Sequence, residues 1–146
     1  MDEQTYFKER LEDQISWLES KSGWNQKRYK RMRTAVIVLS VSLPFATGFI
    51  SESNYGIVLK IGVGLAGVVI AILEGLQSLN KYQENWIAYR ASAENLKREK
   101  MLYLTQVGDY AQTEEAFKRF VMKIEMILNH QDQNWQQYIR KNNSEA

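Results

Sequence analysis

The sequence predicts an all-α membrane protein, in which a two-transmembrane helical hairpin carries a cytoplasmic helical bundle. The first observation behind this prediction is a pair of apolar stretches of 17 residues each, Thr34–Ile50 and Ile57–Leu73, with six residues between them. Each stretch would rise roughly 25 Å as a helix, and a few flanking residues extend it to the ~30 Å hydrocarbon core of a bilayer. The second observation is the distribution of charge beside these stretches.

Basic residues are concentrated directly before the first apolar stretch. Five of the seven residues from 27 to 33 are basic and none is acidic, whereas the turn between the stretches carries only Glu52. Lys and Arg beside a span stay cytoplasmic, so both termini are expected on the cytoplasmic side of a bacterial inner membrane. The basic residues form a predicted lipid-facing flank: Lys27, Arg28, Lys30, Arg31 and Arg33.

The chain is expected to form one domain of five consecutive segments. They are a cytoplasmic N-terminal helix with the basic flank (1–33), a first transmembrane helix (34–50), an extracytoplasmic turn (51–56), a second transmembrane helix (57–79) and cytoplasmic helices (80–146). A buried hairpin in a soluble helical domain is the alternative, because 146 residues can enclose one core. The near absence of polar side chains around both apolar helices argues against it.

Helix boundaries follow from glycine and proline. The N-terminal helix is expected to end at Gly23, because glycine favours the left-handed conformation after helix ends, and a new helix then begins at Trp24. The second transmembrane helix has no stop signal behind it and is expected to continue as one long cytoplasmic helix from about 57 to 105. A loop at 107–110 precedes a last helix that begins at Thr113.

The composition excludes several classes of function. A net charge of +2 gives no large basic field for nucleic acid, and the absence of cysteine removes disulfides and thiolate chemistry. His130 is the single histidine and is expected on the solvated surface. Glycine-rich phosphate loops, metalloprotease motifs and nucleophile elbows do not occur, so no enzyme activity, catalytic residue, cofactor or metal site is expected.

The first transmembrane helix has one more polar face. Ser40, Pro44 and Thr47 recur at steps of four and three, as residues that line a pore would. The alternative is that the hydroxyls bond to backbone carbonyls one turn earlier and that Pro44 kinks the helix for packing.

The second transmembrane helix carries small residues at steps of four, which allow close approach of helix backbones within the hairpin or between copies. These residues are Gly67, Ala71 and Gly75 on one face, and Gly62 with Ala66 on a neighbouring face. Lys60 and Glu74 lie near its opposite ends and would form charged rings in a closed assembly. Snorkelling to the membrane surface is the alternative for Lys60.

The segment after the second span combines aromatic and charged residues into an expected network within the cytoplasmic helices. Its members are Trp86, Tyr89, Arg90, Glu94, Lys97 and Arg98. Glu94 and Arg98 have the spacing of an intrahelical ion pair, and Glu94 is also a partner for Arg90. Structural pairing is favoured over ligand recognition for this network.

A known family shares several of these features in the same order. They are "QISWLESKS", the basic-aromatic run "QKRYKRMR", Pro44 in the first span, "WIAYRASAENLKREKMLYL" after the second span, and a closing helix near Trp135. The chain resembles domain of unknown function 4231, a bacterial branch of the SLATT superfamily of SMODS- and SLOG-associating two-transmembrane effectors. The resemblance implies a membrane-disrupting or pore-forming protein linked to nucleotide-synthesising and nucleotide-sensing partners.

The residues and the resemblance together predict a homo-oligomeric two-transmembrane protein that forms an ion-conducting pore. Its expected partners are the lipid bilayer, further copies of the chain and a cytoplasmic regulatory protein that acts through the cytoplasmic helices. The alternative is a non-conducting, membrane-anchored interaction or scaffold module.

Overall fold

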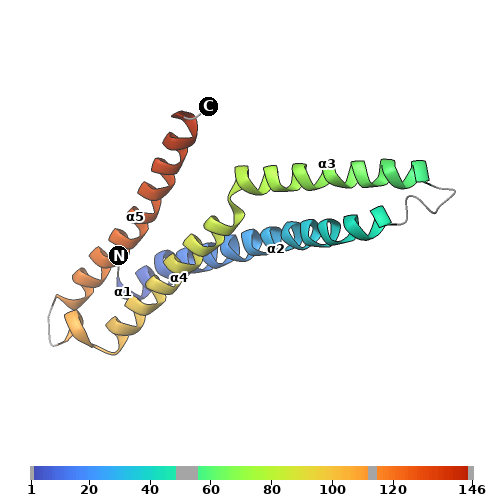
Figure 1. Cartoon of the computed structure of the whole chain (residues 1–146). Coiled ribbons are helices and arrows are strands. Elements are labelled where there is room, and N and C mark those ends of the chain that lie inside the picture. Colours follow the sequence, from blue (N-terminus) through green and yellow to red (C-terminus); the bar gives the residue numbers. More distant parts are fainter. Residues whose placement is uncertain (1, 49–55, 112–114, 145–146) are drawn as a thin grey trace. The chain divides into compact units, whose positions relative to one another are not determined.

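The computed structural model describes residues 2–48, 56–111 and 115–144, with side chains described as far as His130 in the last of these ranges. These residues are almost wholly helical and include no strand, which confirms the predicted all-α class. The elements are α1 (Glu3–Thr5), the π-helical η1 (Tyr6–Glu12), α2 (Asp13–Gly48), α3 (Gly56–Asn80), α4 (Tyr82–Leu104), the 3₁₀ turn η2 (Gly108–Tyr110) and α5 (Ala116–Ser144) (Figure 1).

The chain divides into two compact units. Unit 1 comprises Met1–Gly23 with Trp86–Ala146, and unit 2 comprises Trp24–Asn85. The predicted turn at 51–55, the last two residues of the first apolar stretch and the predicted helix start at Thr113 lie outside the described residues.

The predicted helix end at Gly23 is wrong, because α2 continues through it to Gly48. A single glycine inside a helix costs only about 1 kcal/mol relative to alanine. Leu18, Ser22 and Asn25 follow one another on the same face of α2 at steps of four and three, and all three are buried. The packing of this face on both sides of Gly23 outweighs the propensity of one residue.

The helix also continues through Pro44. Proline removes one backbone donor from a helix interior, which frees a carbonyl one turn earlier. Nearby, the hydroxyls of Ser42 and Thr47 donate to the carbonyls of Leu39 and Pro44, each at 2.8 Å. The alternative that hydroxyls of the polar face bond to backbone carbonyls is confirmed for Thr47, and Ser42, which was not predicted, behaves in the same way.

The helical stretch from Gly56 to Leu104 has the predicted extent but not the predicted continuity. Lys81 has a φ of 44°, in the left-handed region, and separates α3 from α4. Helical hydrogen bonds persist on both sides, from Lys81 N to the Gln77 carbonyl and from Asn85 N to the Lys81 carbonyl, each 3.0 Å long. The side-chain amides of Asn80 and Asn85 donate to the carbonyls of Leu76 and Asn80, so the interruption leaves these groups bonded.

Unit 1 is built around a core shared by its N-terminal segment, α4 and α5. Apolar residues at helical spacing face this core from each element, and those on α4, Ala93 and Leu96, are fully buried. The core comprises Tyr6, Leu11, Ile15, Leu18, Ala93, Leu96, Tyr110, Phe120, Ile124 and Leu128. Gly108, with a φ of 66° that glycine adopts without strain, lets η2 place Tyr110 against this core.

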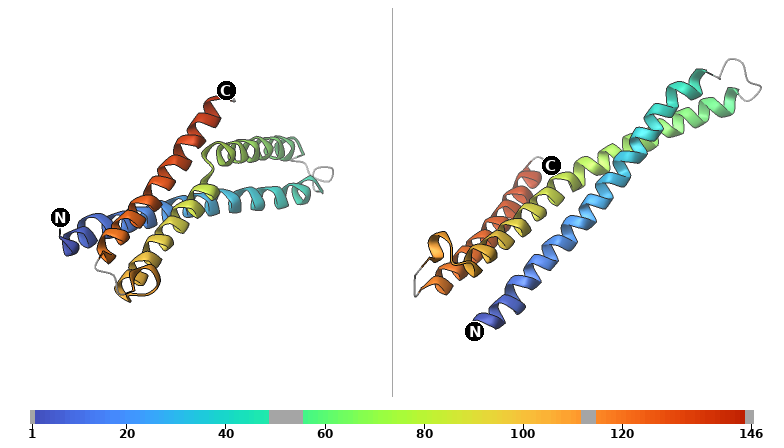
Figure 2. Two further views of the ribbon diagram at one scale, coloured as in Figure 1. Left: turned by 90° about the vertical axis from the view of Figure 1, so that its left-hand side faces the viewer. Right: turned by 90° about the horizontal axis from the view of Figure 1, so that it is seen from below.

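Unit 2 pairs the second half of α2 with α3, and the two helices run in opposite directions (Figures 1 and 2). Most of the less exposed residues recur at alternating steps of four and three on both helices, which is the spacing of a coiled-coil seam. On α2 they are Asn25, Tyr29, Met32, Val36, Leu39, Leu43 and Ala46, and on α3 they are Leu59, Val63, Ala66, Ile70, Leu73 and Gln77. Only one apolar residue of this seam, Val36, is buried.

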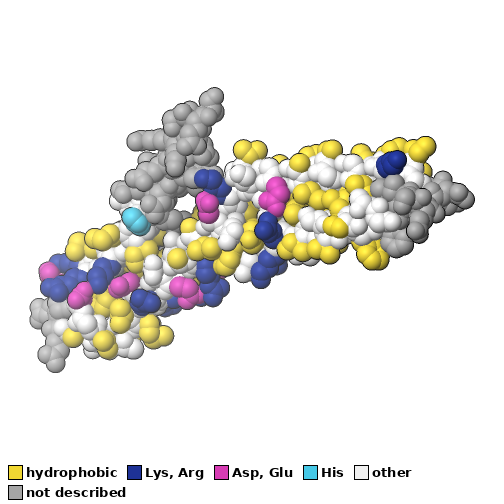
Figure 3. All heavy atoms as spheres, in the orientation of Figure 1, with side chains coloured by type: hydrophobic (Ala, Val, Ile, Leu, Met, Phe, Trp, Pro, Cys, Tyr) yellow, Lys and Arg dark blue, Asp and Glu magenta, His cyan; other side chains and the backbone are white. Residues whose placement is uncertain are grey.

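The remaining surface of unit 2 is largely apolar and exposed (Figure 3). It includes Ile37, Val38, Val41, Phe45, Ile57, Val58, Ile61, Leu65, Val68, Ile72 and Leu76. Among the described residues, one helical stretch, Gly56–Leu104, is long and apolar enough to cross a membrane, and its apolar window has no buried residue. Contiguous apolar surfaces of this extent are rare on soluble monomers.

Candidate functional site

The polar residues of the first apolar stretch lie away from the seam of unit 2. Ser40, Pro44 and Thr47 are all exposed, and they follow Arg33 on one side of α2 at steps of seven, four and three. The Thr47 hydroxyl donates to the Pro44 carbonyl and so already has an acceptor within the helix. The structure therefore gathers the predicted pore residues of α2 on one surface of the unit.

The small residues of α3 also lie outside the seam, except for Ala66, which belongs to it. Gly67, Ala71 and Gly75 are exposed, and a Cβ atom added at Gly67 or Gly75 meets no atom within 4 Å. The hairpin itself therefore makes no close contact through these glycines. Their predicted contact with a second copy remains a prediction.

An ion pair joins the two helices on one side of their seam. A guanidinium nitrogen of Arg33 lies 2.8 Å from a carboxylate oxygen of Glu74. The rings of Trp24 and Tyr82 are also in contact, with centroids 5.9 Å apart. Trp24 precedes Arg33 by nine residues and Tyr82 follows Glu74 by eight, so this contact has the same antiparallel register as the ion pair.

The Arg33–Glu74 pair places the polar residues of α2 and the small residues of α3 on the same side of unit 2. On α3, the side that carries Glu74 presents residues at steps of four and three. We call this surface the polar side, and it comprises Arg33, Ser40, Pro44 and Thr47 of α2 with Lys60, Gly64, Gly67, Ala71 and Glu74 of α3. The opposite side of α3 carries bulky apolar residues instead: Ile61, Leu65, Val69, Ile72 and Leu76.

Some residues of the basic flank have partners among the described residues and others do not. Arg33 pairs with Glu74, and the guanidinium of Arg28 lies 4.9 Å from the centre of the Trp24 ring. Lys27, Lys30 and Arg31 make no ion pair within the described part of the chain. Three of the five basic side chains are thus available to an external anion.

In unit 1, the predicted cytoplasmic network consists mainly of exposed ion pairs. Arg90 pairs with Glu94 at 3.0 Å, whereas Arg98 makes no ion pair with a described residue, so the predicted Glu94–Arg98 pair does not form. Lys97 reaches Glu19 on the N-terminal segment at 2.5 Å, and this hydrogen bond raises the pKa of Lys97. Exposed pairs of this kind contribute little stability each, and of these two only Lys97–Glu19 joins different elements.

The aromatic members of the same network make contacts with the N-terminal segment. The Ser22 hydroxyl donates to the Trp86 carbonyl at 3.0 Å, and the rings of Tyr89 and Trp17 meet edge to face with centroids 5.8 Å apart. The indole N–H of Trp86 is buried and has no hydrogen-bond acceptor among the described residues. These contacts position α4 against the N-terminal segment in unit 1.

Two polar clusters of unit 1 were not predicted. Glu125 accepts from Arg10 at 2.9 Å and from the Tyr6 hydroxyl at 3.2 Å, and the Arg10 hydrogen bond lowers the pKa of Glu125. Burial, with the Glu125 charge, raises the pKa of Tyr6 to about 12. In the second cluster, Glu99 accepts from the Tyr110 hydroxyl at 2.6 Å, and Lys123 lies 2.7 Å from Asp109. Helix spacing alone could not have found these pairs, because every one joins different elements.

A family model described as "Protein of unknown function (DUF4231)" matches residues 13–118. The chain belongs to this family. The matched range contains all of α2, α3, α4 and η2, and so every residue of the polar side and of the basic flank lies within it. Neither a curated protein nor a solved structure matches the chain.

Within this DUF4231 chain, the polar side adds one residue to those that the sequence singled out. Gly64 lies between Lys60 and Gly67 on the same side of α3, and a Cβ atom there meets nothing within 4 Å. The step from Gly64 to Gly67 is three residues, so a search for steps of four misses it. His130 is exposed, as predicted.

Proposed function

We propose that this DUF4231 protein is an oligomeric two-span membrane protein in which the polar side of unit 2 faces other copies and lines a pore, under the control of unit 1. The observation that carries this proposal is the asymmetry of unit 2. One side combines hydroxyls, small residues and charges from both helices, and the opposite side of α3 carries mainly bulky apolar residues, with Gly62 among them.

Insertion into a bilayer follows from the exposed apolar surface. Two helices bury only a narrow seam against each other, and the side chains that remain exposed would each gain from transfer out of water. Helical hydrogen bonding satisfies the backbone groups of α2 and α3 as lipid requires, apart from the carbonyl that loses its donor at Pro44. The uncompensated basic flank and the ring of Trp24 support a cytoplasmic position for the end of unit 2 that carries them.

The topology can be tested by cysteine labelling, because the chain contains no cysteine of its own. Cysteines introduced singly at Ser53 and at Ser144 are expected to react from opposite sides of the membrane in intact cells. Labelling of both from the same side would contradict the two-span hairpin. A cysteine at Ser16, an exposed residue of unit 1, is the matched control and should behave like the one at Ser144.

Association through the polar side follows from the physics of helices in lipid. Apolar side chains gain nothing by leaving lipid for a protein surface of the same polarity, so helices associate where small residues allow close backbone contact and where polar groups find partners. The polar side offers both. A ring of copies that turn this side inward would place Ser40, Thr47 and Lys60 around its axis.

The substitution Gly67→Leu is expected to weaken this association without unfolding the hairpin. A side chain at Gly67 meets nothing within the chain, so its bulk acts only against a neighbouring copy. Gly62→Leu is the matched control: Gly62 has equally open surroundings and lies about 140° around α3 from Gly67. Analytical ultracentrifugation in detergent should find smaller particles for Gly67→Leu than for Gly62→Leu. Equal particle sizes for both variants and the wild type would rule out the contact.

A membrane-anchored interaction module is the second candidate. The Arg33–Glu74 pair favours it, since Glu74 then neutralises Arg33 at the membrane boundary instead of contributing an open charged ring. The resemblance to the SLATT superfamily supports the pore, because its members are proposed membrane-disrupting effectors. Ion flux from vesicles separates the two functions: a pore releases trapped ions, and an anchor leaves the vesicle sealed.

A further inference from the structure

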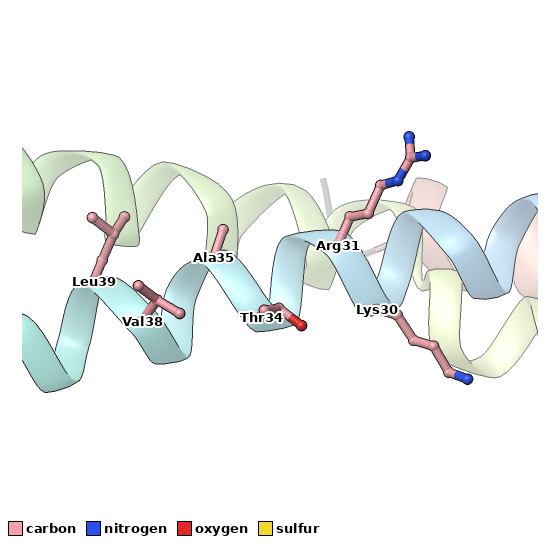
Figure 4. A pocket seen from close by; sticks show the side chains of 6 residues that line it. All are labelled: Lys30, Arg31, Thr34, Ala35, Val38 and Leu39. Carbon is pink, nitrogen blue, oxygen red and sulfur yellow. The ribbon is translucent and has the colours of Figure 1, made fainter.

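The side of α2 opposite Arg33 carries a hollow with a basic end and an apolar end. It is a shallow depression, wide open to its surroundings, with a volume of about 640 Å³, and it is lined by Lys30, Arg31, Thr34, Ala35, Val38 and Leu39. In Figure 4, Lys30 and Arg31 diverge from one end of this surface, and Ala35, Val38 and Leu39 occupy the following turns of the helix. Charged groups, a hydroxyl and then hydrocarbon thus succeed one another along a single helix.

The two basic side chains of the hollow are not neutralised by the protein. Arg31 and Arg33 lie about 200° apart around α2, so the Glu74 carboxylate that pairs with Arg33 is on the other side of the helix. Neither Lys30 nor Arg31 has an ion-pair partner among residues that the structure describes. Unit 2 as a whole contains seven basic and three acidic residues by sequence, so its field favours an anion.

A second hollow continues the first toward Trp24. It encloses about 350 Å³, is lined by Trp24, Lys27, Arg28, Arg31 and Met32, and shares Arg31 with the first. Trp24 is 51% exposed, and an indole ring with one polar edge is suited to the level of lipid head groups. The surface therefore presents, in order along α2, an aromatic ring, uncompensated cations and an apolar groove.

We propose that this surface binds one anionic phospholipid of the cytoplasmic leaflet, with Lys30 and Arg31 at the two edges of its head group and an acyl chain along Ala35, Val38 and Leu39. The inference rests on the proposed membrane insertion of unit 2. The order of groups along the helix matches the order of groups along a phospholipid, and two free cations favour a head group with net negative charge over a zwitterionic one. The site also explains why only part of the basic flank is used in pairing within the chain.

Native mass spectrometry of the full-length protein in detergent tests the proposal by counting bound lipids. Phosphatidylglycerol is expected to bind more tightly than phosphatidylcholine. The double variant Lys30→Gln/Arg31→Gln should weaken phosphatidylglycerol binding about thirty-fold and leave phosphatidylcholine binding unchanged. The variant Lys8→Gln/Arg98→Gln removes the same charge from exposed residues of unit 1 and should retain the wild-type preference. Inorganic phosphate at millimolar concentration should not displace the lipid.

Three results would overturn the proposal. They are equal binding of both lipids by the wild type, the same loss of binding in both double variants, and displacement by inorganic phosphate, which would identify a simple anion site. Circular dichroism that matches the wild type ensures that a loss of binding in Lys30→Gln/Arg31→Gln is not unfolding, and Lys30→Arg should retain binding. Cysteine labelling that contradicts the two-span topology would remove the proposed function together with this site, whereas a correct topology with equal lipid binding would remove the site alone.

Discussion

Replacing Phe120 with alanine is expected to destabilise unit 1 by about 3–5 kcal/mol. Phe120 is fully buried, and its ring stacks on Tyr103 and Phe7 with centroids 4.6 and 5.2 Å apart. It also meets the edges of Tyr6 and Tyr110. Truncation removes the shared partner of four aromatic rings that come from the N-terminal segment, α4 and η2. The resulting cavity cannot close without moving several of these elements.

Hydrogen exchange on the full-length protein measures this effect in unit 1 without requiring unit 2 to unfold. Amides of α4 and α5 that are protected in the wild type should exchange at least about a hundred times faster in Phe120→Ala. Met122→Ala is the control on the same helix, since Met122 is 64% exposed, and its effect should stay within about 0.5 kcal/mol. Equal protection in the two variants would mean that the aromatic cluster does not hold unit 1 together.

The faces of the helices could be predicted from the sequence, because helical spacing alone places a residue on a face. The steps of four and three between Leu11, Ile15 and Leu18 place them on one stripe, and all three are buried. Ala93 and Leu96 behave in the same way on α4. The continuity of the helices was harder to predict. Propensity predicts a helix end at Gly23, but α2 continues through this glycine because the residues on both sides of it are packed. Propensity predicts no break at Lys81, but the helix is interrupted there, and the side-chain amides of Asn80 and Asn85 bond to backbone carbonyls beside the break.

The candidate site was predictable in its members but not in its arrangement. Ser40, Thr47, Gly67 and Glu74 were each singled out from one helix at a time. Spacing within a helix gives no rotation of that helix against its neighbour, and so the sequence could not say that these residues share one side of unit 2. That information comes from a contact between residues 41 positions apart, the Arg33–Glu74 pair.

The Arg33–Glu74 pair also changes what a charge substitution should do to conduction. The sequence predicts separate charged rings of Lys60 and Glu74, whose opposite signs leave the preference between cations and anions open. Because the two charges are 2.8 Å apart, a ring of these pairs is nearly neutral, and removing either partner exposes the charge of the other. The two single variants therefore have opposite expected signs.

If copies of the chain surround a pore, Glu74→Gln should shift its selectivity toward anions and Arg33→Gln toward cations. A ring of unpaired charges at a pore mouth changes local ion concentrations by a factor on the order of ten, so each permeability ratio should change by about that much. Reversal potentials across planar bilayers containing the purified protein measure these ratios under asymmetric salt. The double variant Arg33→Gln/Glu74→Gln is the control and should resemble the wild type, since it removes both charges together.

A structure of the oligomer provides the test that does not depend on an activating signal. An axis sealed by Leu, Ile and Val side chains, with Ser40, Thr47 and Glu74 turned away from it, would defeat the pore and leave the membrane-anchored interaction module. Shifts of the same sign in both single variants would also contradict the proposal, because they cannot arise from the two halves of one ion pair. Opposite shifts that vanish in the double variant would place the Arg33–Glu74 pair beside the permeating ions.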